Sequence, residues 1–222
     1  MSGIRFQAAA VVFPAVVWRF FFMKFSPLVE RLISDLQVMP GVGPRTAQRI
    51  AFYLLDHNRE GAVKLGETLN EAMSRVSYCP KCHSYSDDGA VCSICSSQKR
   101  LATGILCVVE SPADVLAIEQ TGEFEGTFFV LHGHLSPIDG IGPAELGLDQ
   151  LTSMLDTGDY HEIILATNPT VEGDTTAHYI AHIASRRNVT ATRIARGIPV
   201  GGELESIDGS TIMKSLAGRS PL

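Results

Sequence analysis

Two CxxC pairs in the middle of the chain restrict its fold more than any other feature. Cys79 and Cys82 form the first pair, Cys92 and Cys95 form the second, and nine residues separate the pairs. Each pair can present two thiolates to one ion, and the short spacer folds the pairs together, which predicts a tetrahedral zinc site. Because cysteine fills all four positions, none stays open for a catalytic water, and the zinc is expected to be structural.

Alternatives exist for several of these residues. The four cysteines would form disulfides in an oxidising compartment, but the rest of the chain is typical of the cytosol, where thiols stay reduced. His83 directly follows Cys82 and competes as a ligand, although a solvated side chain is expected. The fifth cysteine, Cys107, lies in the apolar run Ile105–Val109 and is expected to be a buried strand thiol.

The 222 residues are enough for more than one module, and the 45% hydrophobic content indicates a globular protein. Charge is distributed unevenly along the chain. Residues 101–222 carry sixteen acidic and six basic side chains, a net charge of −10, whereas residues 26–76 carry six of each. Because an acidic surface repels phosphates, DNA contact is expected from the N-terminal half. The acidic half suits a metal site or a basic protein partner.

The first 22 residues do not fit the pattern of the remainder. Phe6–Trp18 is an uncharged, mostly apolar run, shorter than the roughly 20 residues that a bilayer span needs. Pro14 and the residues after it make a poor cleavage region for a signal peptide. Helix signals begin only at Ser26, so we expect that Met23 is the true start and that residues 1–22 are a non-native extension.

Residues 23–76 have helical periodicity that is interrupted at Pro40–Pro44. Glycines in this turn let the backbone approach a ligand, and the next helix points its positive N-terminal end at the same place. A helix-hairpin-helix phosphate cradle for DNA is therefore predicted, with these residues: Gly41, Gly43, Arg45 and Arg49. A tight turn in a helical bundle is the alternative. One cradle neutralises few phosphates, so a homo-oligomer is expected.

After the cysteine module, 77–98, apolar strands alternate with helices through residues 99–196. This alternation predicts an α/β domain with a parallel sheet covered by helices on both faces. Glu110 follows the first strand, and Glu172 and Asp174 follow the third. Ligand sites form at such strand ends, so the three carboxylates are expected to converge there. The alternative is that they are solvated acids at helix starts.

This layout resembles the Toprim domain of topoisomerases, primases and certain nucleases. In that domain the first strand supplies a catalytic glutamate, and a later strand supplies an Asp-x-Asp pair for magnesium. Here the pair reads Asn168-Pro169-Thr170, without either carboxylate. Magnesium prefers anionic oxygens, so efficient phosphodiester chemistry is not expected and magnesium is not expected as a cofactor, although Glu172 and Asp174 keep an acidic part of the motif.

A helix-hairpin-helix, a four-cysteine module and a degenerate Toprim domain, in this order, resemble the RecR family of bacterial recombination mediators. The resemblance covers about Phe25 to Leu222 and is carried by the cysteine quartet together with these stretches: Leu36–Pro44, Val108–Asp114, Gly133–Pro137, Ala166–Gly173 and Arg196–Glu205. The domains expected are an extension at 1–22, the helix-hairpin-helix region at 23–76, the zinc module at 77–98, the Toprim domain at 99–196 and a C-terminal segment at 197–222.

The resemblance implies a cytoplasmic, nucleoid-associated protein that has no catalysis of its own. Such a protein binds gapped DNA, single- or double-stranded, acts with RecO and RecF, and helps load RecA onto single strands coated by single-strand-binding protein. The family forms ring-like oligomers, which implies a tetramer or a dimer of dimers. The carboxylates Glu110, Glu172 and Asp174 would form an acidic face that docks basic RecO.

Two other functions compete with this one. A Toprim-type magnesium-dependent nuclease with an altered metal site is disfavoured by the missing Asp-x-Asp pair. A plain zinc-stabilised DNA-binding module is disfavoured by the acidic half, which would repel DNA. The glycine- and proline-rich segment 132–147 contains His134 and Asp139, and it is expected to be a structural or interface loop rather than a catalytic one.

Overall fold

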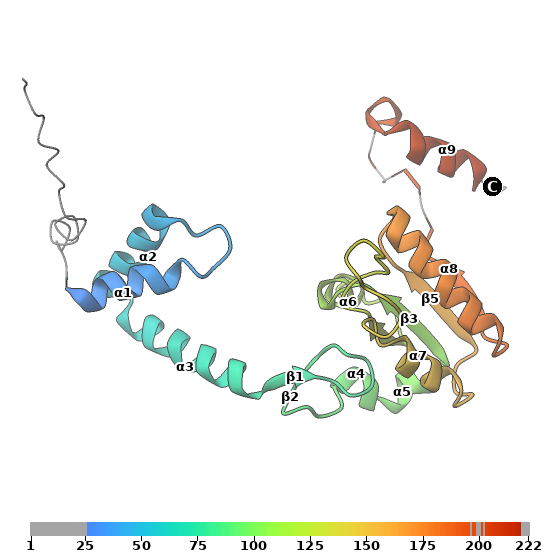
Figure 1. The fold of residues 1–222 in the computed structure, drawn as a ribbon, viewed down its shortest axis with the longest axis horizontal. Helices are drawn as coiled ribbons and strands as arrows, with labels where there is room; N and C mark the ends of the chain where they lie inside the picture. Colours follow the sequence, from blue (N-terminus) through green and yellow to red (C-terminus); the bar gives the residue numbers. More distant parts are fainter. Residues whose placement is uncertain (1–25, 196, 199–200, 202, 219–222) are drawn as a thin grey trace, which may run out of the picture. The chain divides into compact units, whose positions relative to one another are not determined.

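The computed structural model describes residues 26–195, 197–198, 201 and 203–218 (Figure 1). The chain divides into two compact units, Met1–Ala72 and Met73–Leu222. The predicted extension at 1–22 and the predicted start at Met23 lie outside the described residues. In the described part of the chain, no helix has both the length and the apolar character needed to span a membrane.

The first unit is helical, with α1 at Pro27–Leu36, α2 at Pro44–His57 and the beginning of α3, Arg59–Arg75 (Figure 1). Pro27 and Pro44 each stand at the first position of a helix, where the missing N–H would have no helical partner. Within residues 26–72, only Ala47 and Ala51 of α2 are buried. The apolar side chains of α1 and α3 therefore remain partly in solvent.

The second unit begins with a short antiparallel hairpin of β1, Val76–Tyr78, and β2, Tyr85–Asp87, followed by α4, Ser93–Ser96, and α5, Gln98–Leu101. A two-stranded ribbon of this length is not stable alone in water. Here Arg75 and Asp88 close its open end through two hydrogen bonds of 2.8 and 3.1 Å. The cysteine cluster closes the other end.

A four-stranded sheet forms the centre of the second unit. Its strands are β3, Ile105–Val109, β4, Thr127–Val130, β5, Glu162–Ala166, and β6, Thr190–Arg193. They lie in the order β4-β3-β5-β6, and all neighbours are parallel. The predicted α/β fold with a parallel sheet is confirmed.

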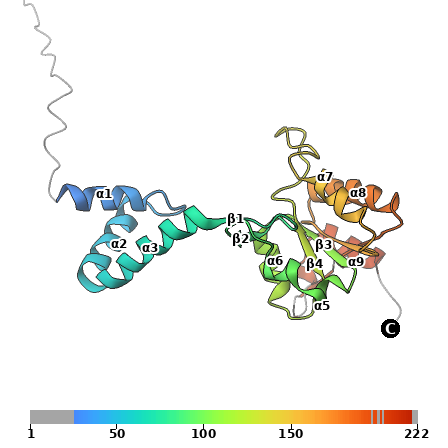
Figure 2. The ribbon, with the colours of Figure 1, turned by 90° about the horizontal axis from the view of Figure 1, so that it is seen from below.

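Helices cover both faces of this sheet, as predicted. On one face α7, Leu148–Leu155, and α8, Val171–Ser185, pack on the larger apolar core (Figure 2). On the other face α6, Pro112–Glu119, and α4 pack on a smaller one that includes Cys107. Burial raises the pKa of the Cys107 thiol to about 12, which keeps it protonated and inert, as expected of a strand thiol. The C-terminal part contains a 3₁₀ helix at Leu204–Ser206 and α9 at Gly209–Ala217.

Candidate functional site

The four predicted cysteines form one cluster, in which every sulfur lies within 4.8 Å of the other three. Four thiolates about 2.3 Å from a central zinc ion would lie about 3.8 Å apart, and the Sγ atoms of Cys82 and Cys92 are 3.6 Å apart. Cys79, Cys82 and Cys95 are buried, and Cys92 is half-buried. The geometry is that of a metal-binding cluster with all four positions filled by protein.

The ionisation of the four thiols also indicates that this cluster binds a cation. Hydrogen bonding from the Cys95 side chain is the main cause that lowers the pKa of Cys82, to about 5. The same contact, together with burial, raises the pKa of Cys95 far above its ordinary value. Buried thiols this close cannot all ionise unless a cation neutralises them. The donor set therefore fits a divalent ion that prefers thiolate ligands.

His83 fixes the cysteine module to the Toprim half, so the expectation of a solvated side chain is wrong. Its ring packs on Phe129, with centroids 4.8 Å apart, and its Nε2 lies 2.6 Å from Oε1 of Gln150 in α7. The amide nitrogen of Gln150 in turn donates to the carbonyl of Pro80. Sequence reasoning missed this contact because its partners lie some 50 to 70 residues away along the chain.

Strand order decides where the carboxylate predicted at the end of β3 lies. The chain runs from β3 to β4 on one side of the sheet and then returns to β5 on the other, so a crevice opens between the ends of β3 and β5. Val109 pairs with Ala166, which places Glu110 beside the residues that follow β5. The predicted ligand position is therefore present.

Glu110 is nevertheless not free to bind a ligand, because Asn168 donates hydrogen bonds to both of its carboxylate oxygens. Oε1 accepts the backbone N–H of Asn168 at 2.8 Å, and Oε2 accepts its side-chain amide at 2.6 Å. The Glu110 side chain is 8% exposed. The amide that replaces the first Asp-x-Asp carboxylate thus serves as a hydrogen-bond donor to the glutamate, where a carboxylate would have shared a metal ion with it.

The first turn of α8 holds the other two predicted carboxylates. Thr170 caps the helix by accepting the N–H of Gly173 at 3.0 Å, and acidic residues are favoured in such a turn. Glu172 is exposed, whereas Asp174 forms a 2.6 Å ion pair with Arg193 from β6. Of the three carboxylates predicted to form an acidic face, Glu110 is thus buried, whereas Glu172 and Asp174 lie in the first turn of α8.

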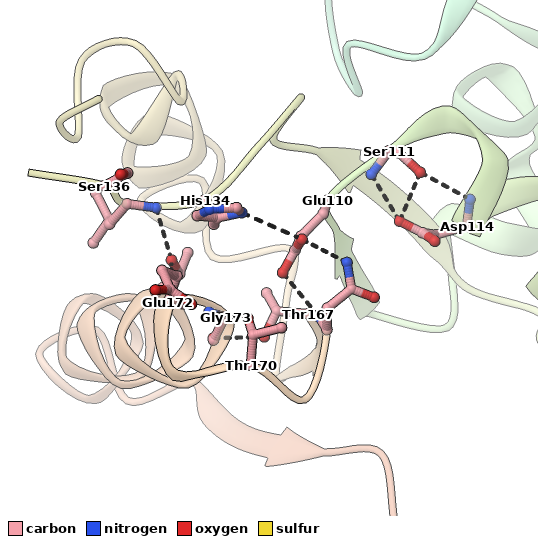
Figure 3. Close-up of polar contacts among 12 residues, drawn as sticks. Glu110, Ser111, Asp114, His134, Ser136, Thr167, Thr170, Glu172 and Gly173 are labelled. Atoms are coloured by element: carbon pink, nitrogen blue, oxygen red, sulfur yellow. Dashed lines mark hydrogen bonds and ion pairs between the residues drawn. The ribbon is translucent and has the colours of Figure 1, made fainter. Parts of the chain in front are cut away.

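The long loop after β4 is tied to the same site. Leu135 donates its N–H to Thr176 of α8 at 2.9 Å, and Ser136 donates to Asp139 at 2.5 Å. Nδ1 of His134 is 3.7 Å from Oε2 of Glu110, too far for a hydrogen bond (Figure 3). The Ser136 hydroxyl donates to Asp139 and also accepts the Asp139 N–H at 3.3 Å, a local loop contact that gives Asp139 a structural setting.

The predicted phosphate cradle lies at the junction of α1 and α2. Gly41 has a φ of +80°, a conformation that favours glycine, and Gly43 is the N-cap of α2. Arg45 and Arg49 are both exposed on α2, and neither has an ion-pair partner among the described residues. The exposed N-terminal end of α2 and two cations thus lie together, which is the arrangement that an anion needs.

Three family models match consecutive parts of the chain. A RecR helix-hairpin-helix model covers residues 29–73, a Toprim model covers 104–195, and a RecR C-terminal model covers 197–220. The chain belongs to the RecR family. These matches agree with the helix-hairpin-helix and Toprim features predicted from the sequence of this RecR family member. The four-cysteine feature lies between the first two matched regions and is supported by the cluster that the structure shows.

Proposed function

We propose that this RecR family member is a DNA-binding recombination mediator in the repair of gapped DNA. It acts with RecO and RecF, helps load RecA onto single strands coated by single-strand-binding protein, and has no catalysis of its own. The observation that carries the proposal is the pairing of Glu110 with Asn168 in a Toprim domain that RecR-specific regions flank. A carboxylate bound in this way is poorly placed to hold the magnesium ions of a nuclease.

In this account, DNA contacts the helix-hairpin-helix turn through its phosphates. The backbone around Gly41 and Gly43 approaches the phosphate, and Arg45 and Arg49 supply positive charge. Phosphate contacts of this kind hold DNA without reading its sequence. A mediator that must bind at any gap needs such sequence-independent contact.

RecO binding is assigned to the acidic side of the Toprim domain. The net charge of −10 over residues 101–222 attracts a basic protein and repels DNA. Glu172 is exposed at the start of α8, and Asp174 is partly exposed beside Arg193. Glu110 supports this surface indirectly, because its hydrogen bond with Asn168 fixes the segment that leads into α8.

The cysteine cluster is assigned a structural zinc ion, and magnesium is given no role. All four positions are cysteine, which suits zinc in a closed site. The protein is placed in the bacterial cytoplasm, at the nucleoid, where thiols stay reduced and DNA gaps arise.

Homo-oligomers are proposed because the helical unit has an open apolar surface. A groove of about 600 Å³ is lined mainly by apolar side chains, including Leu36, Leu54, Val63 and Leu69. Val63 is 62% exposed and Leu69 is 52% exposed, which is unusual for apolar side chains that line one groove. A second copy of the chain covers this groove in a ring-like tetramer or dimer of dimers, and each copy adds another cradle for DNA.

RecA loading tests the proposed function directly. Single-stranded DNA is coated with single-strand-binding protein, and RecA filament formation is followed by its DNA-dependent ATPase. We expect the protein to shorten the lag of this reaction when RecO is present. An unchanged lag, with RecO shown to be active with another RecR protein, would contradict the mediator function.

A further inference from the structure

Three exposed aromatic rings form a row on the second unit. Tyr78 and Tyr85 are cross-strand partners in the β1–β2 hairpin, with ring centroids 5.7 Å apart and ring planes at 20°. The ring of His132, which begins the loop after β4, lies 4.6 Å from that of Tyr78. Tyr78 is 52% exposed, Tyr85 is 59% exposed and His132 is also exposed. This set, called the aromatic row below, therefore lies outside both cores of the sheet.

A stabilising role for the hairpin explains only part of the aromatic row. A cross-strand pair such as Tyr78 and Tyr85 is known to stabilise a two-stranded ribbon. His132, however, comes from a different segment, and its φ of +55° is uncommon for a residue other than glycine. Its Nε2 lies 2.7 Å from the carbonyl oxygen of His83, which fixes the ring beside Tyr78. Strained conformations that the surrounding structure maintains are concentrated at binding sites.

The rigidity of the aromatic row prepares it for a ligand. Cys79 donates its N–H to Ser84 at 2.7 Å beside the tyrosines, and Arg75 and Asp88 close the far end of the hairpin. These contacts hold the backbone that carries the rings, so less backbone motion remains to be frozen when a planar ligand binds to them. The hairpin sheet has two strands only, so it provides an open face and no enclosing pocket.

We propose that the aromatic row is a binding site for the unpaired bases of single-stranded DNA. Successive exposed aromatic rings are a platform on which bases stack, and any base is accepted because every base has a π-face. Outside the cysteines, the charges from Arg75 to Asp88 balance, with Arg75 and Lys81 against Asp87 and Asp88. This part of the second unit therefore lacks the acidic excess that repels phosphate elsewhere.

The site deepens the proposed function and rests on it. The helix-hairpin-helix cradle holds phosphates, which double-stranded and single-stranded DNA share. The aromatic row needs bases that are free of a partner strand, so it would direct the protein to the single-stranded part of a gap. Stacking should also depend less on salt than the phosphate contacts do.

The test compares two oligonucleotides of equal length, one of ordinary single-stranded DNA and one in which every base is removed. Both carry the same phosphates, so a difference in affinity reports contacts with the bases. We expect the unmodified protein to bind the ordinary strand at least about tenfold more tightly, the scale of stacking on aromatic residues. Equal affinity for both strands would overturn the proposal that the aromatic row binds bases, but it would not contradict phosphate binding by the cradle. No binding to either strand would overturn the proposed function as well.

Variants then assign the base-dependent part of the affinity. The double variant Tyr78→Leu with Tyr85→Leu keeps an apolar cross-strand pair but removes two rings. Its affinities for the ordinary and the base-free oligonucleotide should therefore be nearly equal. The double variant Tyr78→Phe with Tyr85→Phe retains both rings and should still prefer the ordinary strand. Tyr179→Leu is the matched control, because Tyr179 is 44% exposed on α8, outside the row. Zinc content and circular dichroism confirm folding.

Two further results are informative. Arg45→Ala with Arg49→Ala should weaken binding to both oligonucleotides by the same factor, which separates the cradle from the aromatic row. If the double leucine variant keeps its preference for the ordinary strand but loses binding to RecO or to itself, the row is a protein interface and the proposal is overturned.

Discussion

At the scale of single residues, Asn168 decides what the Toprim domain can do. Its backbone and side-chain N–H groups both donate to Glu110, whose side chain is buried although Asn168 itself is exposed. A carboxylate at this position would repel Glu110 unless a cation lay between them. One amide therefore converts a potential metal site into an internal hydrogen-bonded pair.

Asn168→Asp should make the fold sensitive to magnesium. Without the ion, two carboxylates face each other and a donor is removed, so the free energy of unfolding should fall by about 1–3 kcal/mol. With millimolar magnesium, part of this stability should be recovered, because the ion binds only the folded state. Thermal unfolding with and without magnesium measures both effects. Asn70→Asp, at an exposed position of α3, is the control. A magnesium shift in the unmodified protein would show that the metal site is already functional.

Gly173→Ala should be among the most destabilising small changes in this region. A Cβ at this position would lie 2.2 Å from the Asn168 carbonyl oxygen and 2.9 Å from Oε1 of Glu110. The backbone must shift, at a cost of about 1–3 kcal/mol in the free energy of unfolding. Chemical denaturation measures this cost. Glu172→Ala, in the same turn but exposed, should change it by no more than about 0.5 kcal/mol. Equal effects of the two changes would contradict the tight packing described here.

At the scale of elements, the cysteine module supports part of the Toprim domain. The carbonyl of Cys82 accepts the N–H of Val130 at the end of β4 at 2.8 Å. The next residue, His83, bonds to the side chain of Gln150 through its ring and to the side chain of His132 through its carbonyl. Cys82, a member of the cysteine cluster, is thus one residue away from the contacts that hold the loop after β4. We therefore expect the loop after β4 to become more mobile when the cysteine cluster has no bound metal ion.

Removal of the metal with a chelator should loosen these elements and spare the others. Amide hydrogen exchange should speed up in residues 76–87 and at Val130, because their hydrogen bonds depend on the folded cysteine cluster. Exchange in β3 and β5, whose bonds lie in the centre of the sheet, should change little. Exchange measured by mass spectrometry, with metal added back as the control, tests this. Uniform protection before and after chelation would mean that the cluster has no structural role.

Local patterns in the sequence predicted most of these elements. The apolar run at Ile105–Val109 indicated a buried strand, and β3 is found there. The alternation of apolar strands with helices after the cysteine module indicated a parallel sheet, which the structure also has. The helix signals that begin at Ser26 marked the start of α1, and the interruption at Pro40–Pro44 marked the turn before α2. The hairpin of β1 and β2 has little burial and was not predicted, because no apolar alternation marks strands of three exposed or half-exposed residues.

The candidate site could be predicted only in part. The rule that ligands gather at strand ends predicted that Glu110 converges with Glu172 and Asp174, and in the structure Glu110 bonds to Asn168, which precedes them in the chain. The burial of Glu110, the pairing of Asp174 with Arg193 and the position of His83 all depend on contacts between distant segments. Neither composition nor periodicity carries that information.

At the scale of the whole molecule, the helical unit is incomplete alone. Two buried alanines form its only fully buried apolar surface within residues 26–72, and its groove leaves large apolar side chains in solvent. Burial of such a surface against a second copy would contribute about 25 cal/mol for each Å² removed from water. Self-association is therefore expected at this surface.

Val63→Glu with Leu69→Glu should prevent that association without unfolding the chain. Both side chains are more than half exposed, so the charge is tolerated in one copy but not in an apolar interface. Mass measurement in solution should change from an oligomer to a monomer, and binding to long DNA should weaken at least about tenfold as avidity disappears. Leu116→Glu, 60% exposed on α6, is the control. An unchanged mass would place the interface elsewhere.

The most direct test of the central claim is binding to gapped DNA in the presence of magnesium, with the DNA examined afterwards on a denaturing gel. We expect the protein to bind the gapped DNA and leave it intact. Arg45→Ala with Arg49→Ala should weaken binding and reduce the dependence of log affinity on log salt by about 1 for each phosphate that the protein no longer neutralises. Cleaved DNA, with cleavage abolished by Glu110→Gln, would contradict the account and show that the Toprim site is catalytic.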